Sequence, residues 1–92
     1  MNKSMGEKEL WSLVGYLEVS QSRKKTLKSI GEEQYKLPSA ISKETNLTSA
    51  QVSNALRDLK KKDLVICLNE DVTKGRLYKS TNRGLEILKQ LK

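Results

Sequence analysis

The chain has 92 residues and a formal net charge of +7, with no histidine and one cysteine. This length fits one small domain with a single core, and the basic balance favours a polyanionic partner, the alternative being a lysine-rich solvated surface. Without histidine, and with a lone Cys67 that can form neither an internal disulfide nor a thiolate zinc cluster, we expect no catalytic site, no metal site and no cofactor.

Residues 1–6 are expected to be a disordered N-terminus, and residues 7–92 one folded domain. The opening MNKSMGEKEL lacks the apolar core of a signal peptide. Apolar runs fall short of the ~18 residues that cross a membrane. We therefore expect a cytoplasmic protein with no membrane partner.

A first amphipathic helix is predicted to begin at Glu7. Its apolar stripe follows helical spacing: Leu10, Trp11, Val14 and Leu17. Because Gly15 weakens a helix, an extended conformation of VGYLEV is the alternative.

The segment SRKKTLKSIGEE is predicted to form the next helix, with Ser20 or Ser22 as its N-cap. Leu27 and Ile30 mark the buried stripe, and Gly31 is placed near the end. Basic side chains lie mostly off this stripe and are candidates for contacts with a DNA backbone: Arg23, Lys24, Lys25 and Lys28.

A helix-turn-helix pattern follows. Pro38 fits the first turn of a short helix, and Asn46 tolerates the left-handed conformation that ends one. Thr48 and Gln51 match a capping box that opens a further helix at 49–62.

The helix at 49–62 has two different faces. One face is apolar: Val52, Ala55, Leu56 and Leu59. The opposite face carries small, amide and basic side chains: Ala50, Asn54, Arg57 and Lys61, flanked by Gln51 and Ser53. A helix that packs on a core and also enters a DNA major groove needs this distribution.

Two strands are predicted at 64–68 and 76–79, joined by the polar loop NEDVTKG into a hairpin. Thr81 then caps a last helix, whose apolar residues recur at helical spacing: Leu85, Leu88 and Leu91. The predicted core seam runs through Leu27, Ile41, Val52, Leu56, Leu59 and Leu85.

The order helix, helix, turn, helix, hairpin, helix is that of a winged helix-turn-helix domain. SQSRKKTLKSI, LPSAISKETNLTSAQVSNALRDLKKKDLV and KGRLYKSTNRGLEIL resemble the matching segments of MarR-like and ArsR-like winged-helix transcriptional regulators of archaea and bacteria, over about residues 20–92. The resemblance implies an α+β, mostly α, winged helix-turn-helix fold with a two-stranded wing hairpin and flanking N- and C-terminal helices. It also implies sequence-specific binding of double-stranded DNA and a role in regulating transcription.

The chain departs from the family pattern at two positions. Asn46 stands where these regulators usually have glycine, and Ser80 where they usually have an apolar residue. The cysteine and histidine clusters of the arsenic-repressor branch are absent, so metal sensing is not implied, and the effector stays unknown.

Candidate DNA contacts lie on the helix at 49–62 and in the wing loop, residues 69–76. Amide side chains suit adenine and arginine suits guanine or phosphate. Asn54 is the first candidate for reading a base, because the cap can engage Gln51. The candidates are Ser49, Gln51, Ser53, Asn54, Arg57, Lys60, Lys61, Lys74 and Arg76. For each, a solvated surface position is the alternative, and Glu70 and Asp71 in the wing loop repel phosphate.

A homodimer is expected, because a symmetric dimer places two recognition helices about one DNA turn apart. The N-terminal stripe and the last helix hold more apolar surface than one small core covers, although Trp11 can instead cap the monomer's own core. The competing function is a winged-helix module that binds protein or RNA. Basic residues on helix, wing and flank together favour DNA. The acidic residues show no arrangement typical of an enzyme.

Overall fold

The computed structural model describes residues 6–91, in which five helices and one two-stranded sheet follow one another. In chain order these are α1 (Glu7–Glu18), α2 (Gln21–Ile30), α3 (Pro38–Thr45), α4 (Ser49–Lys61), β1 (Val65–Cys67), β2 (Tyr78–Ser80) and α5 (Asn82–Leu88). This is the winged helix-turn-helix order, and the predicted fold class is confirmed. The predicted disordered N-terminus lies, apart from Gly6, outside the described residues.

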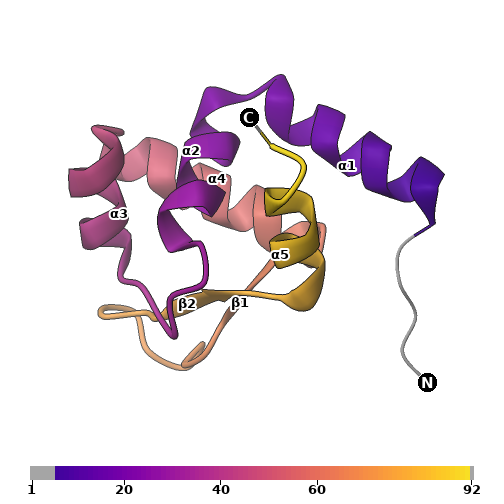
Figure 1. Ribbon diagram of the computed structural model, residues 1–92. Helices are drawn as coiled ribbons and strands as arrows, with labels where there is room; N and C mark the ends of the chain where they lie inside the picture. Colours follow the sequence, from indigo (N-terminus) through magenta and orange to yellow (C-terminus); the bar gives the residue numbers. More distant parts are fainter. Residues whose placement is uncertain (1–5, 92) are drawn as a thin grey trace.

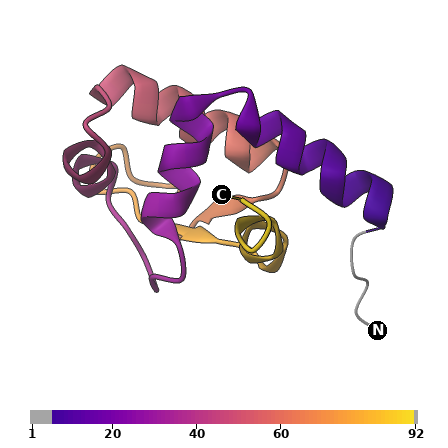
Figure 2. The same cartoon turned by 45° about the horizontal axis from the view of Figure 1, so that its top comes forward.

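Helices α1 and α3 lie at opposite ends of the molecule, with α2 and α4 between them (Figures 1 and 2). In the view of Figure 1 the hairpin lies below α2 and α4, and α5 lies at the right-hand end of the hairpin. None of the helices within residues 6–91 is both long and apolar enough to cross a membrane.

Helix α1 continues through Gly15, so the extended alternative for VGYLEV is wrong. Its buried face consists of Leu13, Val14 and Leu17. Trp11, which was predicted to share this face, is 52% exposed, and the alternative that it caps the core of the monomer is wrong. The inner stripe follows positions 10, 13, 14 and 17, which places position 11 on the solvent side of the helix.

The helix boundaries follow the predicted caps. Ser20 Oγ accepts a hydrogen bond from the Arg23 backbone N–H at 3.3 Å. Asn46 ends α3 in the left-handed conformation, with φ 67°. Thr48 Oγ1 accepts from the Gln51 N–H at 3.1 Å, while Gln51 Oε1 accepts from the Thr48 N–H at 2.9 Å. Both reciprocal bonds of the capping box are therefore formed.

One core joins all the elements, and five of the six residues predicted for its seam are buried: Leu27, Ile41, Val52, Leu56 and Leu59. The sixth prediction, Leu85, is wrong, because its side chain is only partly buried. Leu88, also assigned to the core, is partly buried and packs against it. Ile87 is the residue of α5 that is fully buried.

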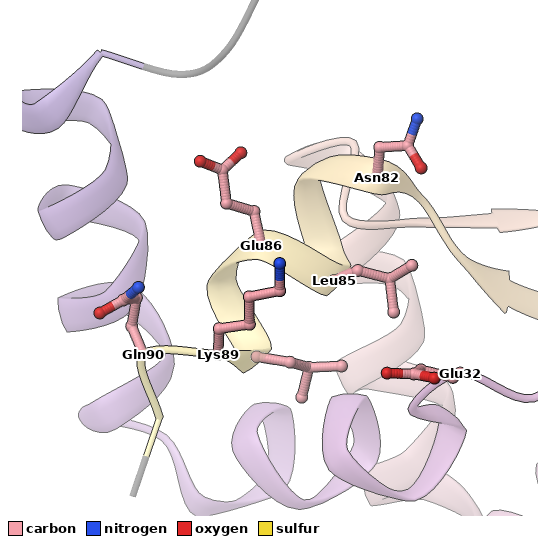
Figure 3. Close-up of a pocket in the computed structure, with 7 residues that line it drawn as sticks. Glu32, Asn82, Leu85, Glu86, Lys89 and Gln90 are labelled. Atoms are coloured by element: carbon pink, nitrogen blue, oxygen red, sulfur yellow. The ribbon is translucent and has the colours of Figure 1, made fainter.

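The orientation of α5 follows from Gly84. A Cβ atom at this position would lie 2.2 Å from the carbonyl oxygen of Leu64, so only glycine permits the approach of α5 to that backbone. With Gly84 and Ile87 turned inward, Leu85 instead lines an open pocket of about 750 Å³, together with Leu88 and Glu32 (Figure 3).

The hairpin is antiparallel, with the register Val65↔Ser80, Ile66↔Lys79 and Cys67↔Tyr78. Both strands are shorter than predicted, and the second begins two residues later. A third segment that the sequence analysis did not predict pairs on the other side of β2. There the Lys36 N–H donates to the Tyr78 carbonyl at 2.8 Å, and the Tyr78 N–H donates to the Lys36 carbonyl at 3.0 Å. A pairing of one residue leaves no alternating pattern that a sequence would reveal.

Candidate nucleic-acid interface

Helix α4 has its apolar face in the core and its polar face in solvent. Val52, Ala55, Leu56 and Leu59 are buried. The residues of α4 that are predicted to contact DNA are all exposed: Ser49, Gln51, Ser53, Asn54, Arg57, Lys60 and Lys61. The predicted two-faced helix is therefore present, with its polar face available to a ligand.

An arginine of the neighbouring helix α2 contacts α4. Arg23 Nε lies 3.4 Å from Asp58 Oδ2 of α4, and Arg23 Nη1 donates to the Tyr16 carbonyl of α1 at 2.9 Å. The guanidinium also lies 3.9 Å from the centroid of the Tyr16 ring. This side chain links α1, α2 and α4, and it is engaged inside the protein.

The other basic residues of α2 differ in their surroundings. Lys24 Nζ lies 2.7 Å from Glu18 Oε1 and is largely covered, whereas Lys25 and Lys28 are exposed. Arg23 and Lys24, both considered for contacts with a DNA backbone, therefore have partners within the protein.

The wing loop is organised by two of its own side chains. Arg76 Nε donates to the Val72 carbonyl at 2.7 Å, and Arg76 Nη2 donates to the Glu70 carbonyl at 3.2 Å. Asn69 Nδ2 donates to the Gly75 carbonyl at 3.1 Å, and Asn69 Oδ1 accepts from the N–H of Leu77 at 2.8 Å. Arg76, predicted as a DNA contact, therefore also shapes the loop, while Lys74 is exposed.

Helix α4 and the wing loop share a cleft of about 390 Å³. The α4 side is lined by Ser53, Arg57 and Lys60, and the loop side by Thr73, Gly75 and Arg76. The structure thus brings together four of the predicted contact residues. The other five lie outside the lining of this cleft: Ser49, Gln51, Asn54, Lys61 and Lys74.

Sequence reasoning did not find Thr73 and Gly75, because neither has a charge or a pattern that distinguishes it within a polar loop. Asn69 was also missed, although asparagine at the start of a loop is a known signal of side-chain bonding to nearby backbone. Such residues can be located only once the path of the loop is known.

An ion pair joins the two sides of the cleft. Lys60 Nζ of α4 contacts Glu70 Oε2 of the wing loop. The hydrogen bond with Glu70 raises the pKa of Lys60, and the same bond lowers the pKa of Glu70, so both groups are charged at neutral pH.

The two amide side chains on the polar face of α4 differ in their surroundings. The Gln51 side-chain oxygen accepts the Thr48 N–H in the capping box, which leaves the Asn54 amide as the freer of the two.

No group of three or more histidine, cysteine, aspartate or glutamate residues among residues 6–91 is arranged to hold a metal ion. The surface described above is instead a basic and amide face with a neighbouring loop. Its side chains supply hydrogen-bond donors and positive charge.

Comparison with solved structures finds the same fold in proteins of very different sequence. TubR from Bacillus thuringiensis serovar israelensis pBtoxis, solved bound to 24 bp of tubC, has a TM-score of 0.75 over 97% of this chain and 95% of its own, at 12% identity. Two mutants of S. aureus MepR, the second from a multidrug-resistant clinical isolate, have TM-scores of 0.67 and 0.57. Their identities are 20% and 18%, and the match covers 91% and 95% of this chain and 64% and 74% of theirs.

No family model and no curated protein sequence matches the chain. At identities this low, the structural likeness establishes the winged-helix fold, and a fold alone does not assign a function. The function must therefore be argued from the surface of α4 and the wing loop.

Proposed function

We propose that this protein binds double-stranded DNA in a sequence-specific manner and acts as a transcriptional regulator. In this proposal α4 enters the major groove and the wing loop contacts the backbone or the minor groove. We also propose a cytoplasmic location, because the regulators that the sequence resembles belong to bacteria and archaea, whose DNA lies in the cytoplasm.

The observation that supports the proposal most is the distribution of side chains on α4. Its inner face is held rigidly in the core, and its outer face presents Asn54, Arg57 and Lys61 side by side. A helix fixed in this way can hold an amide against an adenine edge while its basic residues contact phosphates. The solved complex of TubR with tubC DNA is an instance of this fold bound to a duplex.

The proposed DNA-binding residues have different roles. Asn54 reads a base, and Gln51 and Ser53 flank it. Arg57 and Lys61 contact phosphates at the edges of the groove, with Ser49 at the start of the helix. Lys74 reaches the backbone or minor groove from the exposed side of the wing loop. Lys60 and Arg76 already have partners within the protein.

We also propose that the protein works as a homodimer through α1 and α5. Arg83 Nη2 lies 2.7 Å from Glu9 Oε2, so the two helices present one joined surface. Trp11 of α1 is 52% exposed, and the partly buried Leu85 and Leu88 lie on α5. Val14 and Leu17 are used by the core of the monomer, so the apolar surface left for a partner is smaller than the sequence predicted.

The single tryptophan gives a direct test of dimerisation. If Trp11 is covered by a second copy, its fluorescence should shift to shorter wavelength as the protein concentration rises through the micromolar range. Equilibrium sedimentation should show the same transition. A monomer in both experiments, with and without DNA, would refute the dimer.

DNA binding itself is tested by selecting bound sequences from a random duplex pool, followed by titration at several salt concentrations. A recurring motif is expected from the pool. If one monomer neutralises about four phosphates, the logarithm of affinity should fall with the logarithm of salt with a slope of roughly −3.6. Binding that is insensitive to salt and selects no motif would favour the alternative, a winged-helix module for protein or RNA.

A further inference from the structure

The ion pair between α4 and the wing loop lies at the cleft between the two elements that the proposed function places against DNA. Lys60 lines this cleft, and its Nζ contacts Glu70 Oε2. The side chains are 42% and 54% exposed, so a phosphate oxygen can reach the ammonium group. An exposed pair of this kind contributes little to folding stability.

The position of Glu70 is set by the wing loop. Arg76 Nη2 holds the Glu70 carbonyl, and Asn69, the residue before it, binds the backbone at both Gly75 and Leu77. The carboxylate is therefore carried on a braced loop and directed at the last turn of α4. Like other exposed glutamates it is charged at neutral pH, and the hydrogen bond with Lys60 lowers the pKa of Glu70 further.

We propose that Glu70 occupies the place of a DNA phosphate on Lys60 and so limits the affinity of the protein for any duplex. This inference rests on the proposed DNA-binding function. Glu70 already balances the single positive charge of Lys60, so a phosphate that approaches the ammonium also meets the carboxylate charge and gains less than it would at an unpaired lysine. Base reading by Asn54 lies outside the cleft, so Glu70 limits the sequence-independent part of binding and leaves the choice of sequence unchanged.

The test compares Glu70→Gln with a matched control, Asp71→Asn. Asp71 is the next residue of the same loop, is exposed, and takes no part in the ion pairs found among residues 6–91. Each variant therefore removes one negative charge from the wing loop, but only Glu70→Gln removes the charge that contacts Lys60. Affinity for a mixed-sequence duplex is measured across a series of salt concentrations. Thermal melts check that both variants are folded, as expected for exposed positions.

In Glu70→Gln, the released Lys60 should neutralise one more phosphate. The salt slope should steepen by about 0.9, which corresponds to a rise in affinity of about eightfold near 0.1 M salt. Asp71→Asn should give a smaller rise and an unchanged slope. The ratio of affinities for preferred and scrambled duplexes should stay the same in both variants.

A second pair of variants identifies the group that is released. Lys60→Gln should leave the slope unchanged in the native background, and should lower it by about 0.9 when Glu70→Gln is also present. Lys61→Gln, on the same exposed turn, should lower the slope in both backgrounds.

Two outcomes would overturn the inference. If Glu70→Gln and Asp71→Asn change the slope equally, or Lys60→Gln lowers it in the native background, Glu70 does not hold Lys60 and this inference alone fails. If no variant shows salt-dependent binding, the proposed function fails as well, so the two failures are distinguishable.

Discussion

Gly84→Ala tests the packing of α5 on the backbone of Leu64, the residue before β1. In a helix, alanine is favoured over glycine by about 1 kcal/mol, so local propensity alone predicts stabilisation. The structure predicts the opposite, because the new Cβ would lie 2.2 Å from the Leu64 carbonyl oxygen, about 1 Å inside ordinary contact. That oxygen belongs to the backbone of a fully buried residue and accepts the Thr81 N–H at 3.0 Å, so it cannot rotate away.

The expected magnitude combines three effects. Overpacking costs about 3 kcal/mol, disturbing the Thr81 hydrogen bond costs about 1, and helix propensity returns about 1, so Gly84→Ala should lose about 3 kcal/mol. Urea denaturation monitored by circular dichroism measures this loss. Gly15→Ala is the control, because a Cβ there meets nothing within 4 Å; it should stabilise the protein by about 0.5–1 kcal/mol. Equal effects of the two substitutions would refute the close approach of α5.

Further substitutions test the core, the cap and one ion pair, that of Lys36 with Glu44 of α3. Leu56→Ala, at a position 3% exposed, should cost about 2–5 kcal/mol in the same denaturation assay, and a loss under about half a kcal/mol would contradict its place in the core. Thr48→Ala removes the N-cap of α4 and should cost about 1 kcal/mol, whereas no loss would mean that the cap is dispensable. The hydrogen bond from Lys36 lowers the pKa of Glu44, so its stabilisation is present above the ordinary carboxyl pKa and is lost as the pH falls through the lowered value. Glu44→Gln should therefore reduce the loss of stability in acid measured by thermal melts, and an unchanged acid profile would contradict this.

The sequence predicted the elements whose signals are local. The capping box of Thr48 and Gln51, the left-handed Asn46 and the apolar face of α4 each depend on neighbours within one or two turns, and all three are present. Their agreement also placed the helix-turn-helix correctly, because caps and apolar spacing pointed to the same boundaries.

The sequence failed where position is decided by distant contacts. Leucine spacing in the last helix indicated Leu85 as core, but the approach of Gly84 to Leu64 rotates the helix and buries Ile87 instead. Helical spacing put Trp11 on the apolar stripe of the first helix, whereas Leu13, Val14 and Leu17 form the buried face of α1.

The candidate site shows the same division. Exposure of the polar residues of α4 was predictable, since it follows from the apolar face opposite them. The engagement of Lys60 by Glu70, and of Arg23 by Asp58, was not, because each contact joins residues on separate elements. Charge alone therefore predicted a polyanionic partner, but it did not predict which basic residues are already engaged within the protein.

The central claim, that the outer face of α4 reads duplex DNA, is tested most directly by titrating Asn54→Ala and Lys61→Ala against preferred and scrambled duplexes at several salt concentrations. Asn54→Ala should lose about 1–3 kcal/mol of discrimination at one base position and keep the salt slope of the native protein. Lys61→Ala should weaken both duplexes alike and lower the slope by about 0.9. If Asn54→Ala instead weakens both duplexes equally, Asn54 does not read a base, and the assignment of this face of α4 to the major groove is wrong.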